Sequence, residues 1–381
     1  MFVFKWWVRT VAAVAFVVIC LQSVPSNAAW ITTQVTNNSY DDVNAVQNEQ
    51  GTAFAWKEND NDYLYYSDGT TNQLVHTSNP YDYDVDGNRV MFVSWDGDRE
   101  VYRWISGSGT TKITNNTAWE FEVDAGSGSR YAYMSDYPGN QEIYYYNGSS
   151  TVRVTNNSYI DQGLMMSGVY AAWLAVDGQN NIKLYNGSST INLTGSGDYV
   201  VGSAVMDMDG NHVVWMALYG GTDYEIAYYN GSSTQRLTNN TTYDYYPRVS
   251  GNRVAWYGPG GIDGGTDNEI YYYNGSSVVQ LTVNDVSDQN PDVNGTEVVW
   301  FQYDPGPPEM RILLYDGSTT STVVANSSVK YSLSYAGNRI TWHQYDGSDY
   351  EIFMAEWVPD TPTPTLTPTL TPTLTPTLTP T

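Results

Sequence analysis

The chain has 381 residues, of which 41% are hydrophobic, and its formal net charge is −25. This length can bury a large core, either as one repetitive domain or as two average ones. Its acidity excludes nucleic acid as a partner and disfavours anionic lipid surfaces, because both present phosphate, whereas cations and neutral or basic partners stay open.

Residues 1–28 have the pattern of a signal peptide. Two basic residues precede an apolar run over 11–21, and small residues end the segment at Ala28. A retained membrane anchor is the alternative, but an apolar run of this length is short for spanning a bilayer. Cleavage would remove the only cysteine, Cys20, and change the formal net charge from −25 to −27. We therefore expect a secreted or cell-surface protein with no disulfide and no membrane span in the mature chain.

The next 328 residues, 30–357, repeat one unit eight times. Each unit contains a segment like that at 251–256, which ends in an aromatic residue, and successive aromatics lie 36 to 44 residues apart. These aromatics are Trp56, Phe92, Tyr133, Trp173, Trp215, Trp256, Trp300 and Trp342. Four short strands fit into each unit, and they are rich in Tyr, Val, Ile, Thr and Trp. Repetition of four strands about every 40 residues is typical of a β-propeller.

A recurring turn joins the third and fourth strands of the units. It has the sequence Asn-Gly at Asn147-Gly148, and again at 186–187, 230–231 and 274–275. Asp-Gly replaces it in two other units. Such pairs predict a two-residue hairpin in which both central residues have positive φ.

The two ends of the repeat region complement each other. The last unit has a third strand at 350–357 but no fourth, while residues 34–40 closely match the fourth-strand segment at 153–159. An N-terminal strand that completes the last blade would pair the edges that are otherwise open. We therefore expect an all-β fold over 30–358, an eight-bladed β-propeller of four-stranded antiparallel blades, with seven blades and one aberrant unit as the alternative.

The motif at 247–256, with those at 267–271 and 280–282, resembles the TolB-type, WD-like propeller repeat of bacterial and archaeal envelope proteins. The resemblance covers the region between the signal and the tail. It implies a protein-docking platform, a propeller attached to a peptidase, or a surface-layer or carbohydrate-related module. The chain departs from the commonest form of the repeat, because Ser-Gly-Asn at 250–252 stands where many members have Ser-Pro-Asp-Gly.

The C-terminal residues 359–381 form a tail of Thr, Pro and Leu after an initial Pro-Asp. Proline at this density favours extended polyproline geometry, so we expect a semi-rigid linker or tail.

Topology predicts where a ligand would bind. In an up-and-down blade the loops between the second and third strands share one face with the connections between blades. These loops vary in length, from 8 residues between Phe92 and Glu100 to 13 between Trp256 and Glu269. Variable loops on a rigid scaffold commonly bind ligands, so we expect binding on that face.

Carboxylates gather at the same face. An Asp-x-Glu pattern precedes the third strand, and single aspartates stand 12 residues before the repeated aromatics. The candidate ligand-binding residues are Asp161, Asp244, Asp288, Asp223, Glu225, Asp267, Glu269, Asp349 and Glu351. A ring of oxygen ligands for Ca²⁺ or a polar ligand is one interpretation. The favoured one is structural, because one binding site would not need equivalent carboxylates in so many blades.

A separate metal candidate lies at Asp82, Asp84 and Asp86. These residues match the opening of a calcium loop, Asp-x-Asp-x-Asp-Gly, but Val93 stands where the bidentate glutamate belongs. In a strand the three side chains would share one face.

We expect no other cofactor and a monomer that binds an extracellular protein or glycan without catalysis. An enzyme that acts on extracellular polysaccharide through paired carboxylates is the second hypothesis, and a calcium-stabilised structural repeat is the third. The histidines give catalysis little support, since His76, His212 and His343 lie in different units without metal-ligand spacing.

Overall fold

The computed structural model describes residues 28–59, 61–136, 140–195, 198–200, 206–219, 223–260, 267–306 and 308–359. Residues Trp30–Trp357 form one compact unit. Nearly all of the expected signal peptide and nearly all of the Thr/Pro tail lie outside the described residues. Within the described part, no helix is long and apolar enough to cross a membrane.

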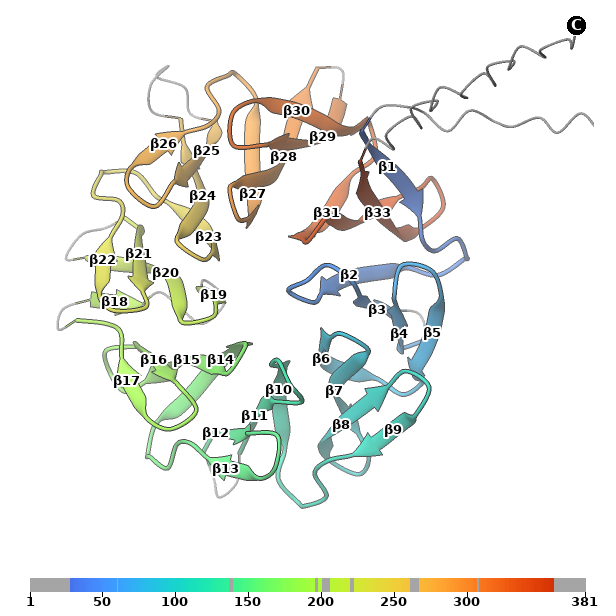
Figure 1. Ribbon diagram of the computed structural model, residues 1–381, viewed down its shortest axis with the longest axis vertical. Helices are drawn as coiled ribbons and strands as arrows, with labels where there is room; N and C mark the ends of the chain where they lie inside the picture. Colours follow the sequence, from blue (N-terminus) through green and yellow to red (C-terminus); the bar gives the residue numbers. More distant parts are fainter. Residues whose placement is uncertain are drawn as a thin grey trace, which may run out of the picture. The chain divides into compact units, whose positions relative to one another are not determined.

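Eight antiparallel sheets form a ring, and each contributes one blade (Figure 1). Blade 1 contains β2 (Asp42–Gln47), β3 (Phe54–Glu58), β4 (Tyr63–Ser67) and β5 (Asn72–His76). Blade 2 contains β6 (Pro80–Asp86), β7 (Arg89–Trp95), β8 (Arg99–Ile105) and β9 (Gly109–Lys112). Blade 3 contains β10 (Glu120–Ala125), β11 (Tyr131–Ser135), β12 (Glu142–Tyr146) and β13 (Thr151–Arg153). Blade 4 contains β14 (Ile160–Ser167), β15 (Tyr170–Val176), β16 (Asn181–Tyr185) and β17 (Thr190–Asn192).

Blade 5 contains β18 (Asp198–Val200), β19 (Met206–Asp209), β20 (His212–Tyr219), β21 (Glu225–Asn230) and β22 (Thr234–Arg236). Its β18 and β19 both pair with β20, so two short strands take the place of the single first strand of the other blades. Blade 6 contains β23 (Tyr245–Ser250), β24 (Arg253–Pro259), β25 (Asn268–Tyr273) and β26 (Val278–Gln280). Blade 7 contains β27 (Ser287–Asn294), β28 (Glu297–Pro305), β29 (Pro308–Tyr315) and β30 (Thr320–Asn326).

Blade 8 closes the ring with a strand from the other end of the repeat region. It contains β31 (Lys330–Ala336), β32 (Arg339–Tyr345) and β33 (Tyr350–Val358), and β1 (Ala29–Gln34) pairs with β33. Just after β1, the Val35 amide donates to the Ile352 carbonyl at 2.7 Å, and the Ile352 amide donates to Thr36 Oγ1 at 2.9 Å. The expected closure by the N-terminal strand and the count of eight blades are both confirmed.

The repeated aromatics fill the junctions between blades. Trp256, for example, packs with Val214 and Tyr228 of the preceding blade, and Trp56 of blade 1 packs with Ile352 of blade 8. An apolar cluster of this kind lies at each of the eight junctions in the described ring. A single blade cannot bury its aromatic residue, so the ring is the unit that folds.

The turn between the third and fourth strands differs from the expected one. In blade 3 the central residues are Gly148 and Ser149, and of these only Gly148 has a positive φ, 97°. Asn147 precedes the turn, and its Oδ1 accepts hydrogen bonds from the Ser149 and Ser150 amides at 2.9 and 3.0 Å. The expectation of positive φ at both residues of the Asn-Gly pair was therefore wrong. Glycine alone supplies the positive φ, as in a II′ turn, and the asparagine side chain caps the loop.

Candidate binding face and its supporting carboxylates

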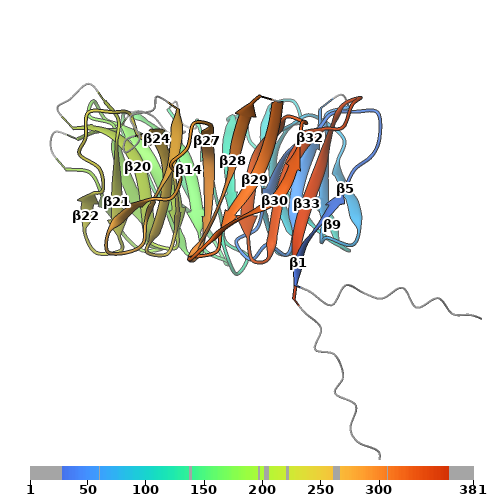
Figure 2. The same ribbon diagram turned by 90° about the horizontal axis from the view of Figure 1, so that it is seen from above.

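The strands of the ring end on two opposite faces (Figure 2). The loop face contains the starts of the first strands, the ends of the second strands, the hairpins between second and third strands, and the connections between blades. The turn face contains the short turns at the other ends, such as 147–150. These two names are used below.

Exposed aromatic side chains concentrate on the loop face. Of the ten exposed tyrosines and tryptophans among the described residues, nine lie there. The nine are Tyr40, Tyr81, Trp95, Trp119, Tyr243, Tyr246, Tyr303, Tyr331 and Tyr345. The tenth, Trp357, lies at the end of β33 on the turn face. Sequence analysis predicted binding on this face but did not identify its exposed aromatic residues, because the chain has 34 tyrosines and 13 tryptophans and only the fold separates the exposed ones from the core.

One part of this surface surrounds Arg99. Its guanidinium carbon lies 4.2 Å from the ring centre of Tyr81 and 5.4 Å from that of Trp119. The rings of Trp95 and Trp119 meet edge to face, with centroids 6.1 Å apart. These cation–π and aromatic contacts hold large amphipathic side chains in place at the surface.

A second part surrounds Tyr246, which lies at a β-bulge in β23. The pairing of β23 with β24 shifts register between Tyr245 and Arg248, and Tyr246 has a φ of 47°. A positive φ is costly for a bulky side chain, so the surrounding structure must hold it. The ring of Tyr246 is 48% exposed and stacks on Tyr257 with centroids 5.9 Å apart. The bulge therefore fixes an aromatic ring on the loop face.

The first strands also line a cavity of about 420 Å³. Arg248 lies in it, 3.7 Å from Asp207, and Asp292 of the next blade contributes to the same wall. Burial raises the pKa of Asp292 to about 6, although the charge of Arg248 opposes this shift. The cavity thus presents one guanidinium between two carboxylates.

The candidates Asp161, Asp244 and Asp288 lie beneath the loop face, at most 3% exposed. Each accepts a hydrogen bond from the indole Nε1 of its own blade's tryptophan, at 2.9, 2.9 and 2.7 Å. The second oxygen of each accepts from an asparagine side chain four residues earlier: Asn157, Asn240 and Asn284. Asp42 makes the same two contacts with Trp56 and Asn38, and sequence analysis missed it. The recurring spacing Asn-x-x-x-Asp could have identified Asp42 from the sequence.

The candidate glutamates Glu225, Glu269 and Glu351 are also buried, and they extend this arrangement. An oxygen of Glu269 accepts the backbone amide of Asn284 at 2.9 Å, and Glu225 and Glu351 do the same with Asn240 and Asn38. Each glutamate therefore holds the asparagine that binds the aspartate of the next blade. Burial raises the pKa of Glu269 to about 7 and that of Asp244 to about 6.

These contacts favour the structural interpretation of the repeated carboxylates, since they connect one blade to the next at equivalent positions. Ligand binding by these residues stays a prediction. The other three candidates, Asp223, Asp267 and Asp349, lie closer to the surface at the hairpins and are partly exposed. Asp223 and Asp267 each keep one buried oxygen without a hydrogen-bond partner among the described residues.

The candidate metal residues lie in β6, the innermost strand of blade 2 (Figure 1), and each has a different partner. Asp82 and Asp84 accept the Val123 and Ala125 amides of the next blade at 2.8 and 2.9 Å. Asp86 pairs with Arg89 at 2.6 Å. Asp84 also contacts Asp124, and burial raises the pKa of both carboxyls. Metal binding by Asp82, Asp84 and Asp86 stays a prediction.

No family model matches the sequence, and a search of curated proteins finds no match. Several solved structures are similar in fold. The computationally designed Ika8 protein has 14% identity and a TM-score of 0.54, and the match covers 85% of this chain and 98% of that one. The propeller domain of the Trilobed protease from Pyrococcus furiosus, described as having an open velcro topology, has 10% identity and a TM-score of 0.50 over 74% of this chain and 95% of that one.

A puromycin-hydrolysing peptidase from Mycobacterium tuberculosis has 12% identity and a TM-score of 0.52 over 80% of this chain. The chain covers only 57% of that peptidase. At these identities the likeness shows the fold alone. The chain is thus a β-propeller repeat protein.

Proposed function

We propose that the chain is a non-catalytic binding module of the cell surface, of the TolB-like kind, which presents its loop face to an extracellular protein. The observation that carries this proposal is the concentration of nine exposed aromatic side chains on that face. Tyrosine and tryptophan are enriched at protein interfaces, because they supply a large rigid contact area at low cost in conformational entropy. The formal charge of −25 favours a neutral or basic partner.

A glycan is the second candidate ligand. A glycan is favoured by the exposed pair Trp95 and Trp119, because the two indole rings contact each other edge to face at the surface. Catalysis through the paired carboxylates is not favoured, since Asp244 and Asp288 are buried and bonded to Trp256 and Trp300.

The test measures binding of three purified proteins to peptide and glycan arrays. They are the wild type, the double variant Trp95→Ala/Trp119→Ala and the single variant Trp357→Ala. The second variant removes the exposed aromatic side chain of the turn face and serves as the matched control. Loss of about 2 kcal/mol or more of binding free energy is expected for the double variant only. Equal binding by all three proteins, at unchanged melting temperatures, would refute the proposal.

A further inference from the structure

A cavity of about 270 Å³ lies on the turn face between blades 7 and 8. Three aromatic residues line it: Trp30 near the start of β1, Trp357 near the end of β33, and Tyr335 of β31. The ring centroids of Trp30 and Trp357 lie 5.6 Å apart with an angle of 57° between the rings, and those of Trp30 and Tyr335 lie 6.1 Å apart at 68°. Rings inclined so steeply meet like the sides of a cage and do not form a flat stack.

Two carboxylates give the same cavity a negative charge. Glu297, at the start of β28, accepts a hydrogen bond from the Tyr335 hydroxyl through Oε2. Asp316, in the turn between β29 and β30, accepts hydrogen bonds from Thr319 and Ser318 at 2.7–3.0 Å. These bonds hold the pKa of Asp316 well below its usual range, so the carboxylate stays charged. No lysine or arginine occurs among the described residues that line the cavity.

The cavity lies where other blades place a tyrosine ring. Tyr66, Tyr145 and Tyr228 each pair with the residue before the repeated aromatic of their blade. Their hydroxyls donate to backbone carbonyls in the turn of the next blade at 3.0–3.1 Å. Leu314 has the same register in blade 7, since it pairs with the residue before Trp300. A leucine side chain is shorter than a tyrosine ring, and Leu314 lines the cavity that remains.

Blade 7 also reverses a charge at this place. The residue three positions before the repeated aromatic is an acid only in blade 7, where it is Glu297. Four blades have an arginine there: Arg89, Arg130, Arg253 and Arg339. In blades 3 and 6, Arg130 and Arg253 contact the phenol groups of Tyr145 and Tyr272. Those blades thus provide both a ring and a cation, whereas blade 7 provides neither.

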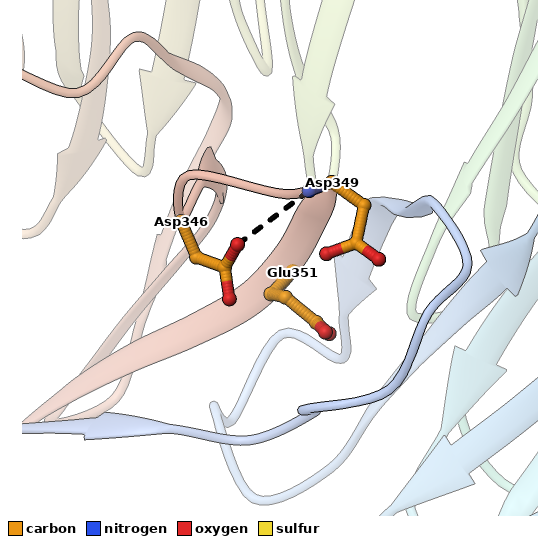
Figure 3. A group of neighbouring side chains, drawn as sticks. All are labelled: Asp346, Asp349 and Glu351. Carbon is orange, nitrogen blue, oxygen red and sulfur yellow. Dashed lines mark hydrogen bonds between the residues drawn. The ribbon is translucent and has the colours of Figure 1, made fainter.

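A short side chain or a group of acids alone does not distinguish this place. Blade 4 also has a leucine in that register, Leu184, but Tyr170 packs against the same apolar cluster. Carboxylates also converge at Asp346, Asp349 and Glu351, whose ligand oxygens lie within 4.8 Å of one another (Figure 3). The buried Oε2 of Glu351 has no hydrogen-bond partner among the described residues, but the same is true of Glu100, Glu142, Glu225 and Glu269. The cavity between blades 7 and 8 differs, because rings, carboxylates and open space occur together.

We propose that this cavity binds a quaternary ammonium group, such as that of choline. Such a cation is attracted to the faces of tryptophan and tyrosine rings and to nearby carboxylates. Glu297 and Asp316 already accept hydrogen bonds from the protein, so they attract a cation mainly by their charge. A primary ammonium would bring three N–H donors that need acceptors, whereas a quaternary ammonium has none and buries its methyl groups against the rings. Pockets for drug-sized ligands have about 300–1,000 Å³, so this smaller volume suits a single cationic group.

The closure of the ring supplies two walls of this site. Trp30 and Trp357 lie near the ends of the paired strands β1 and β33, where the other blades have a hairpin turn (Figure 1). The inference does not depend on the proposed binding at the loop face, since the cavity lies on the turn face. Array ligands that carry no quaternary ammonium group are not expected to occupy it, so Trp357→Ala remains a valid control for the loop face.

The experiment titrates choline chloride into the full chain at constant ionic strength, with calorimetry and tryptophan fluorescence as readouts. We expect a dissociation constant of about 1 mM, as befits a ligand with few atoms. Ethanolamine keeps the hydroxyethyl chain but carries a primary ammonium, and it should bind at least about tenfold more weakly. Vesicles of phosphatidylcholine form a second arm. Binding to them assigns the group to a lipid headgroup, and binding of free choline alone assigns it to a soluble or glycan-linked ligand.

Two substitutions test the cavity itself. Leu314→Tyr restores the ring of the other blades and should abolish choline binding. Glu297→Gln keeps an acceptor for the Tyr335 hydroxyl but removes the charge, and it should weaken binding about fivefold. The matched control Asp285→Asn removes the same charge from an exposed position between blades 6 and 7 and should leave binding unchanged.

The proposal is overturned if the wild type shows neither heat nor a fluorescence change up to about 50 mM choline, fifty times the expected dissociation constant. Wild-type affinity in Leu314→Tyr and Glu297→Gln overturns it equally, and Glu297→Gln alone decides if Leu314→Tyr does not fold. Equal affinity for ethanolamine and choline overturns the assignment to a quaternary group.

Discussion

The indole Nε1 of Trp256 donates a hydrogen bond of 2.9 Å to Oδ1 of Asp244, and both side chains are at most 3% exposed. The other oxygen of Asp244 accepts from Asn240, whose backbone amide is held by Glu225 of the preceding blade. A single buried carboxylate thus joins the core tryptophan of one blade to the third strand of its neighbour. The same connection recurs through Asp42, Asp161 and Asp288.

Loss of this connection should destabilise the ring without affecting an active site. Asp244→Ala leaves the Trp256 N–H and the Asn240 amide without their acceptor, which costs about 1–3 kcal/mol. Trp256→Phe removes the indole N–H donor and part of the side-chain volume. In a double-mutant cycle followed by denaturant unfolding, we expect a coupling energy of about 1–3 kcal/mol. Additive single effects would show that the hydrogen bond contributes nothing to stability.

The buried acids should make the protein less stable as the pH rises above 6. Burial raises the pKa of Asp42, Asp82, Glu120 and Glu269 to about 7 in each case. Between their usual pKa near 4 and this raised value, the folded state binds more protons than the unfolded state. The stabilisation is complete below pH 4 and is lost as the pH rises through 7.

Titration of His343 has the opposite effect on stability, at lower pH. Burial lowers the pKa of His343 to about 4, so its contribution to stability grows only from pH 4 to about 6.5. We therefore expect the melting temperature in chelator to fall from pH 6.5 to pH 8. Asp82→Asn, whose amide oxygen can still accept the Val123 amide, should make this slope shallower. A melting temperature that rises over the same range would contradict the assignment.

A close backbone approach joins the turns of blades 1 and 8. Gly51 has a φ of 64°, and a Cβ there would lie 1.9 Å from the Ala336 carbonyl oxygen. Gly87 has a similar φ of 56° and open space around it. Gly87→Ala should cost about 1–2 kcal/mol for the left-handed conformation alone. Gly51→Ala should cost clearly more, because the backbone of blade 8 must also move. Chemical denaturation measures the free energy of unfolding of both variants, and an equal loss in the two would exclude this contact.

Blade 8 replaces the connecting aspartate with Lys330. Its ammonium donates to Asn326 Oδ1 at 2.6 Å and to the carbonyls of Met310 and Ser328 at 2.6 and 3.0 Å. Lys330→Met removes these three charge-assisted hydrogen bonds, and we expect a loss of about 2–3 kcal/mol in the free energy of unfolding.

Lys330→Asp is the informative comparison. Rotation of the Asn326 amide would rebuild the pattern of blade 7, where Asp288 accepts from Asn284, Trp300 and Gln302. Blade 8 has the matching donors Trp342 and Gln344. We expect Lys330→Asp to destabilise less than Lys330→Met in the same unfolding assay. The reverse order would show that the lysine contacts are specific to this blade.

The architecture could be predicted because its signals lie within one repeat. The spacing of Trp256 and its equivalents, and the match between 34–40 and 153–159, predict eight blades and their closure without any knowledge of contacts. The hydrogen bonds that connect neighbouring blades were harder to predict from the sequence. Asn240 alone suggests a turn residue, and its contact with Asp244 and Glu225 becomes evident only when neighbouring blades are placed side by side.

The binding face was expected from topology, but contacts that depend on the arrangement of the blades were not. On the inner strands, for example, Asp84 and Asp124 meet across a blade junction although 40 residues separate them in the chain. The exposure of Tyr246 depends on a bulge, and the sequence Tyr-Tyr-Pro-Arg around it gives no sign of a positive φ. Properties that arise from blade-to-blade geometry therefore lay beyond the repeat pattern.

The central functional claim is that ligands bind the loop face. It is tested most directly by hydrogen-exchange mass spectrometry of the chain with a ligand selected on the arrays. We expect slower exchange in loop-face segments such as 94–99, 116–120, 242–246 and 329–332, and no change in the turn-face segments 147–150, 186–189 and 274–277. Protection confined to the turn face would contradict the claim.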